Sequence, residues 1–219
     1  MRKGIIGTAL ASVCVAVLVV SGCSENINEL KENARAKALS EPVMAAEETE
    51  EEGTEEESVS PEQMDLIKYN YYVELNNEIV KLMDDIDYYY EVVEYDEEFA
   101  LIPDSGYTYG YRIRGFGKDL ADDCIQLADM EPAYETLDPL IKEMAEPLKE
   151  LMAAFSEVSR SNDYAANQYQ KAKELHAVIY PAADEFEPMG YEFIHAVSAV
   201  ADERIAAEEE EMKAEGRLI

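Results

Sequence analysis

The fold is decided by residues 60–93, which read SPEQMDLIKYNYYVELNNEIVKLMDDIDYYYEVV. Ser60, Pro61 and Gln63 form a helix start, because serine and glutamine can bond each other's backbone amides and proline fits the first helical position. Apolar side chains then recur at every third or fourth position, which predicts one apolar face on a long helix that ends near Tyr95. These side chains are Ile67, Tyr71, Leu75, Ile79, Leu82, Ile86, Tyr90 and Val93.

Three further segments have the same helical period. Residues 118–130 predict a short helix, residues 138–158 a second, and residues 163–215 a long final stretch. Prolines inside the last two segments predict kinks, and residues 188–190, Pro-Met-Gly, predict either a kink or a turn. Residues 61–219 should therefore form an all-α domain, an elongated antiparallel bundle of long kinked helices with one loop rich in glycine and tyrosine.

Residues 1–22 have the pattern of a bacterial signal peptide. Two basic residues precede an uncharged stretch that lasts until Glu25. Within it, Val20-Ser21-Gly22-Cys23 resembles the lipobox, in which small residues let a peptidase cut before a cysteine that carries lipid. We therefore predict that Cys23 anchors the chain to a membrane through its acyl chains, facing outside the cytoplasm in the cell envelope. An uncleaved membrane helix is the alternative.

Residues 23–60 have the composition of a spacer. Their last third is dominated by glutamates between Glu47 and Glu57, and blocks of like charge repel one another and stay disordered. The chain is thus predicted to consist of a signal peptide (1–22), a lipidated cysteine with an acidic disordered tether (23–60) and a helical domain (61–219).

The charge and the cysteines exclude several classes of function. The chain has a formal net charge of −31, and nucleic-acid binding requires a surplus of Lys and Arg, so we predict no nucleic-acid partner. After cleavage Cys124 would be the only thiol outside the anchor, which excludes an internal disulfide. Because Leu120, Cys124 and Leu127 recur at helical spacing, Cys124 is predicted to be a buried apolar residue.

One metal-binding pattern is present. Residues 192–195 contain Glu192 and His195 in the Glu-x-x-His spacing of carboxylate-bridged di-metal bundles, which need a second copy and two further glutamates. His176 would stand roughly 28 Å from His195 on one continuous helix, or about 10 Å away in height if the chain reversed between them. We therefore predict no metal and no cofactor, and interpret both histidines as partly buried and bonded to neighbours. A metal-dependent enzyme of the envelope remains the alternative function.

The exception to the helical character is the segment 103–117, PDSGYTYGYRIRGFG, whose glycines and proline predict an irregular loop. Aromatic and guanidinium side chains are typical of protein contact surfaces, so the loop is a candidate contact patch for a protein or a glycan. The patch consists of Tyr107, Tyr109, Tyr111, Arg112 and Arg114. The alternative is a loop whose aromatic side chains simply pin it to the bundle.

Two stretches resemble a known family. Residues 68–77, KYNYYVELNN, and residues 171–176, KAKELH, are similar to the YiiG-like family of uncharacterised bacterial lipoproteins over most of residues 61–215. The resemblance implies a helical lipoprotein domain without an assigned activity. We expect a membrane-anchored envelope lipoprotein whose non-enzymatic helical domain binds a protein or a surface polymer.

Overall fold

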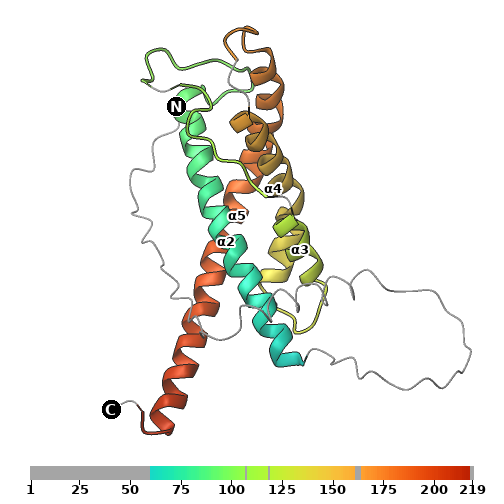
Figure 1. The fold of residues 1–219 in the computed structure, drawn as a ribbon, viewed down its shortest axis with the longest axis vertical. Helices are drawn as coiled ribbons and strands as arrows, with labels where there is room; N and C mark the ends of the chain where they lie inside the picture. The colour runs from blue at the N-terminus through green and yellow to red at the C-terminus, as the bar shows by residue number, and fades with distance from the viewer. Residues whose placement is uncertain (1–59, 107, 118, 161–163, 218–219) are drawn as a thin grey trace, which may run out of the picture. The chain divides into compact units, whose positions relative to one another are not determined.

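The computed structural model describes residues 60–217 apart from Tyr107, Lys118 and residues 161–163 (Figure 1). The predicted signal peptide, Cys23 and the tether up to residue 59 lie outside the described residues. Residues 59–219 form one compact unit. In its described part the helices are α2 (Pro61–Val92), α3 (Asp119–Leu127), α4 (Leu137–Arg160) and α5 (Gln170–Ala214).

The all-α prediction is confirmed. Within the described residues the extended pairing is limited to one isolated antiparallel bridge, between Val93 and Leu101, which closes a short hairpin after α2. The Glu94 amide donates to the Ala100 carbonyl at 2.8 Å and the Ile102 amide to the Val92 carbonyl at 2.9 Å. None of the described helices carries an apolar run of the length and purity that a bilayer crossing requires.

The start of α2 is the capping box that the sequence predicts. The Gln63 amide donates to the Ser60 hydroxyl at 3.2 Å, and the Ser60 amide donates to the Gln63 side-chain oxygen at 2.9 Å. Two backbone amides that helix geometry leaves without carbonyl partners are thereby satisfied. The helix ends at Val92, three residues before the predicted end, because Val93 already has extended geometry (φ −114°, ψ 138°).

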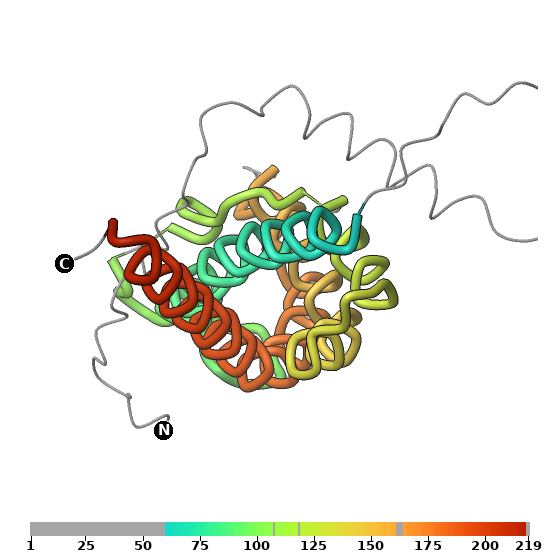
Figure 2. The backbone as a smooth tube through the Cα atoms, turned by 90° about the horizontal axis from the view of Figure 1, so that it is seen from below, coloured from blue at the N-terminus to red at the C-terminus, as the bar shows by residue number. Residues whose placement is uncertain are grey.

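The helices pack with alternating directions around a common centre, as Figures 1 and 2 show. α4 and α5 follow each other as an antiparallel pair. α2 also runs antiparallel to α5, because Asp65 near its start meets Arg204 late in α5, and Tyr89 near its end meets His176 early in α5. α3 lies against the first half of α4.

α5 is one uninterrupted helix of 45 residues, so the predicted alternative of a turn at residues 188–190 is wrong. Phe186 and Phe193 on either side are both completely buried, so the same face of the helix stays against the core through the Pro-Met-Gly segment. Gly190 is buried where α5 meets α2, and a Cβ atom there would lie 2.6 Å from Met83 Cε. Its lack of a side chain permits this close approach, and burial of the continuous face outweighs the hydrogen bond lost at Pro188.

The predicted apolar face of α2 is largely correct, but toward both ends of the helix the buried face is shifted by about one residue from the predicted one. Leu75, Ile79, Leu82, Ile86 and Val93 are fully or almost fully buried. Tyr71 and Tyr90 are only partly buried, whereas Tyr72 and Lys68 are completely buried. A lysine on the buried face is not what periodicity alone predicts, and Lys68 is accommodated there because its ammonium group has three buried or part-buried acceptors.

Candidate functional site

The loop between the hairpin and α3 is held to the bundle by aromatic side chains. Tyr109 is only 8% exposed and packs edge-to-face on Tyr164, with ring centroids 4.7 Å apart, and on Tyr89 at 5.9 Å. Burial raises the pKa of the Tyr109 hydroxyl well above its usual range. Of the predicted patch, Tyr109 therefore belongs to the core, as the pinned-loop alternative expects.

Two further residues fix the second half of the loop. Ile113 and Phe116 are buried, and the Phe116 amide donates to the Ser156 hydroxyl of α4 at 3.0 Å. Tyr109, Ile113 and Phe116 thus attach the loop to the bundle at three places along eight residues. The backbone between these anchors has little freedom to move away from α2 and α4.

Arg114 provides a fourth anchor through Asp85 of α2. The Arg114 amide donates to Asp85 Oδ2 at 3.0 Å, and its Nε and Nη2 donate to Oδ1 at 3.2 and 3.1 Å. Nη2 also donates to the Lys81 carbonyl at 2.9 Å. Asp85 is 2% exposed, and its burial raises the pKa of the carboxyl group while the bonds from Arg114 oppose that rise. Arg114 therefore acts as a structural clamp.

Tyr111 and Arg112 lie between these anchors and have different surroundings. Tyr111 is 82% exposed, the largest exposed fraction among the large hydrophobic side chains described. The Arg112 guanidinium stands 5.0 Å from the centre of the Tyr88 ring on α2, within the range of a cation–π contact. Tyr107, the remaining member of the predicted patch, lies outside the described residues.

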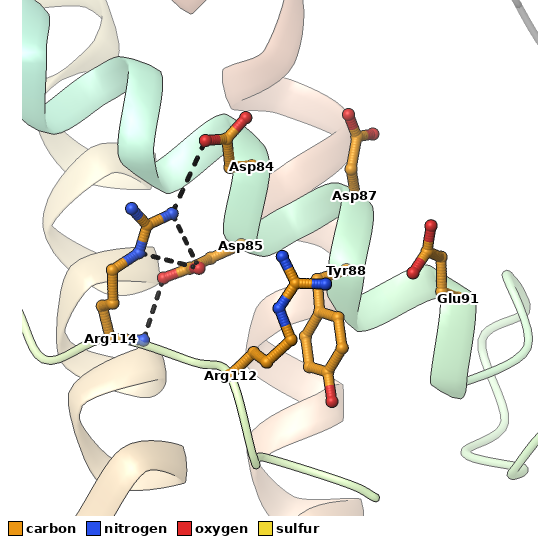
Figure 3. Close-up of a pocket in the computed structure, with 7 residues that line it drawn as sticks. All are labelled: Asp84, Asp85, Asp87, Tyr88, Glu91, Arg112 and Arg114. Atoms are coloured by element: carbon orange, nitrogen blue, oxygen red, sulfur yellow. Dashed lines mark hydrogen bonds and ion pairs between the residues drawn. The ribbon is translucent and has the colours of Figure 1, made fainter. Parts of the chain in front are cut away.

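Arg112 and Arg114 form one wall of a surface groove of about 500 Å³ (Figure 3). The other wall is a face of α2, from which three exposed carboxylates project on the same side. The complete lining is Asp84, Asp85, Asp87, Tyr88, Glu91, Arg112 and Arg114. The predicted patch is thus divided: two members line the groove, Tyr111 projects into solvent and Tyr109 is buried.

The carboxylates of α2 were not predicted as part of this site. The sequence suggests a solvated helix face for Asp84, Asp85 and Asp87, and this interpretation is wrong for Asp85, which is buried under Arg114. The sequence does contain one indication of an acidic surface here, because the spacing of Asp84, Asp87 and Glu91 places three acids on one side of a helix. Nothing in that spacing indicates that a loop more than 20 residues later covers the neighbouring turn.

Comparison with known proteins gives a family. Residues 63–218 match the family described as "Protein of unknown function (DUF3829)". The chain belongs to this family. No curated protein and no solved structure matches it. The DUF3829 description gives no activity and no site residues.

The histidines of this DUF3829 member lie far apart on α5. His176 is 1% exposed; its Nε2 lies 2.8 Å from the Asp96 carbonyl and its Nδ1 2.9 Å from the Tyr89 hydroxyl. Since a carbonyl only accepts, Nε2 carries the proton and Nδ1 accepts the Tyr89 hydroxyl.

The Glu-x-x-His pattern has different surroundings. Glu192 and His195 are exposed, so the prediction of a partly buried His195 is wrong, whereas that of a bonded His176 is confirmed. Because α5 is continuous, the two histidines are separated by roughly 28 Å along its axis. Across the described ranges, no three His, Cys, Asp or Glu side chains are grouped so that they could hold a metal ion.

A second polar cluster lies at the start of α2. Lys68 is 0% exposed, and its ammonium group donates to Asp138 Oδ2 at 2.8 Å and to the carbonyls of Met130 and Pro132 at 2.7 and 3.0 Å. The Tyr72 hydroxyl donates to the other oxygen of Asp138 at 2.5 Å. All three protons of the ammonium group have acceptors, so this cluster joins α2, α4 and the preceding connection and offers no opening to a ligand.

Cys124 is a structural residue, as predicted. Its side chain is completely buried, and its sulfur lies 3.5 Å from the Tyr71 carbonyl. Burial raises the pKa of the thiol well above its usual range. The thiolate required for nucleophilic chemistry is therefore disfavoured at this position.

Proposed function

We propose that this DUF3829 member is an envelope lipoprotein, anchored to a membrane through Cys23, whose non-enzymatic helical domain binds a protein through the surface around Tyr111. A surface polymer is the second class of ligand that the same surface could contact. The proposal combines a domain held at a membrane with a rigid contact surface that faces solvent.

The observation that supports binding is the way Tyr111 is presented. The Tyr111 ring is 82% exposed, whereas its neighbours at 109 and 113 are buried and hold the loop against the bundle. The cost of ordering the loop has therefore been met before any partner arrives. Tyrosine is a frequent hot-spot residue because it offers a large contact area with few rotatable bonds.

The anchor is supported by sequence alone. Val20-Ser21-Gly22-Cys23 resembles a lipobox, and residues 68–77 and 171–176 resemble the YiiG-like lipoproteins. A cysteine that carries two or three acyl chains gives a stable attachment, whereas one chain gives marginal binding. A Cys23→Ala variant is expected to leave the membrane fraction, and a mature product that lacks acyl groups would contradict the anchor.

Photo-crosslinking in cells tests the binding surface. A photoreactive phenylalanine replaces Tyr111 in the full chain, and the matched control places it at Ile205, which is also exposed. Ile205 follows Arg204, whose partner Asp65 lies about 30 Å along α2 from Asp85. We expect a discrete crosslinked product from position 111 that is missing from position 205. Crosslinking at position 111 that does not exceed the control would refute the proposal.

A further inference from the structure

We propose that His176 is an acid-sensitive switch: its neutral side chain holds the hairpin of residues 93–102 against α5, and its protonation releases that hairpin and the loop that follows. The switch follows from the contacts of His176 alone. Its consequence for the contact surface around Tyr111 rests on the proposed function.

His176 joins three segments of the chain. The residue belongs to α5, its Nε2 donates to the Asp96 carbonyl of the hairpin, and its Nδ1 accepts the Tyr89 hydroxyl of α2. The side chain is completely enclosed, and the ring centroids of Tyr89, Phe99 and Tyr180 lie 5.9, 5.7 and 5.8 Å from that of the imidazole. Only a neutral ring with its hydrogen on Nε2 can make both bonds.

A second proton on the imidazole conflicts with these contacts. Nδ1 would become a donor and would face the Tyr89 hydroxyl, which is itself the donor in the present bond. The new charge would have no counter-charge, because the ring contacts a carbonyl, a hydroxyl and aromatic rings. Aromatic faces attract a cation, but more weakly than the water that the cation would lose. Protonation therefore favours an open arrangement in which water reaches the ring.

The other ionisable groups around His176 do not supply the missing charge. Burial raises the pKa of the Tyr89 and Tyr109 hydroxyls well above their usual range, so both remain neutral. The Asp96 carboxylate is exposed and accepts a backbone amide within the hairpin at 3.2 Å. On α5, the Asp184 carboxylate accepts the Tyr95 hydroxyl at 2.8 Å. Neither carboxylate is bonded to the imidazole.

Release of the hairpin would reach Tyr111 through Tyr109. The Tyr109 ring packs on Tyr89 at 5.9 Å and on Phe99 at 5.7 Å, and both of these rings also contact His176. Tyr109 is the first anchor of the loop, and Tyr111 follows two residues later. Opening around His176 thus removes two supports of Tyr109 and loosens the segment that presents Tyr111.

Hydrogen exchange of the backbone amides tests this inference. The full chain, purified in an uncharged detergent, is labelled in deuterated buffers between pH 7.5 and pH 5, and the uptake is corrected for the pH dependence of the chemical exchange rate. The readout is the hairpin, in which the Glu94 and Ile102 amides donate to backbone carbonyls. Peptides from α4 provide an internal reference.

The expected change has a defined size. An exposed histidine takes up a proton near pH 6.5, and if only the open form binds that proton, each further pH unit multiplies the open population about tenfold. Corrected exchange in the hairpin should therefore be about 30-fold faster at pH 5 than at pH 7.5, against less than about threefold in α4. A rise in the hairpin that does not exceed the rise in α4 would overturn the inference.

The two histidines of the chain provide matched variants. His176→Gln keeps a donor and an acceptor but takes up no proton, so its hairpin should exchange at the same corrected rate at both pH values, whether that rate is slow or fast. His195→Gln removes the exposed histidine of the same helix and should retain the full pH dependence. A pH dependence that persists in His176→Gln, or that disappears in His195→Gln, would assign the effect to another group and refute the switch.

The nitrogen signals of the histidine rings give a check on the unaltered residue. In His195→Gln the remaining signals belong to His176, and at pH 7.5 they should be those of a neutral ring with its hydrogen on Nε2. A charged His176 ring at pH 5, with the hairpin amides still protected, would show that the closed structure accepts the proton and would overturn the inference.

The cellular crosslink at position 111 separates the switch from the proposed function. Exchange in the purified chain involves no partner, so a missing crosslink refutes the proposed function and leaves the switch intact. A specific crosslink combined with pH-independent exchange of the hairpin has the opposite meaning. Both are supported if the crosslink yield falls in cells held at pH 5 and does not fall in the His176→Gln chain.

Discussion

Replacing Lys68 by methionine keeps an unbranched side chain of similar length and removes its ammonium group. In the folded chain that group is completely buried and bonds Asp138, the Met130 carbonyl and the Pro132 carbonyl. The substitution leaves a largely buried carboxylate without its counter-charge and two carbonyls without a donor. Donors from Tyr72 and from the Tyr134 amide remain on Asp138, so the carboxylate keeps part of its solvation.

The expected cost follows from the burial of the pair. Removing one partner of a buried ion pair destabilises a protein by about 3–5 kcal/mol, because the remaining charge is neither hydrated nor paired. A domain of this size has a total stability of about 5–15 kcal/mol, so the midpoint of urea unfolding should fall by a large fraction. The helix content at zero denaturant should be retained if the total lies in the upper part of that range.

Urea unfolding of residues 59–219, followed by circular dichroism, measures this cost. Lys81→Met is the matched control, because Lys81 pairs with Glu78 on the surface of the same helix and its side chain is 45% exposed. Such a pair contributes about 0–1 kcal/mol. If Lys68→Met and Lys81→Met lower the unfolding free energy by the same amount, the buried cluster contributes no more to stability than an exposed ion pair.

Three further substitutions or treatments probe the core. Gly190→Leu forces a side chain into the contact with Met83 and should cost about 1–3 kcal/mol in the same unfolding assay, whereas an unchanged midpoint would mean that α2 and α5 are farther apart. Cys124 should react slowly with a thiol reagent up to about pH 9 and rapidly once urea unfolds the chain, since burial raises its pKa; fast reaction of the folded chain would contradict its burial. His176→Phe keeps an aromatic ring but leaves the Tyr89 hydroxyl without its acceptor, and should lower the unfolding free energy by about 1–3 kcal/mol. An unchanged unfolding free energy would mean that this hydrogen bond does not contribute to stability.

The sequence predicts the helices because their causes are local. The capping box at Ser60 involves residues three apart, and the apolar period of α2 is visible within any two turns. Cys124 was placed correctly for the same reason. The continuity of α5 was left open, because Pro188 and Gly190 disfavour a helix locally and only the packing of Phe186 and Phe193 on the core decides in its favour.

The contact surface depends on partners that are distant in sequence, and local patterns do not specify them. Tyr109 and Tyr111 are two residues apart in the same loop, yet one is buried and the other is 82% exposed. Asp85 is buried because Arg114, 29 residues later, returns to it. Lys68 can be buried because its ammonium group finds acceptors there, and these acceptors lie 62 to 70 residues later in the sequence. The burial of each of these side chains depends on the tertiary structure and cannot be predicted from the local sequence.

The ion pair between Asp65 and Arg204 has a consequence for the order of assembly. These residues are 139 positions apart, and Arg204 Nη2 also approaches the Tyr134 hydroxyl at 2.6 Å. Neighbouring segments such as α4 and α5 can associate as soon as both have been synthesised, whereas the first turns of α2 must wait for the distal part of α5. Closure of this end should therefore be a late event in folding, and a nascent chain that stalls before residue 204 would leave Asp65 without its guanidinium partner.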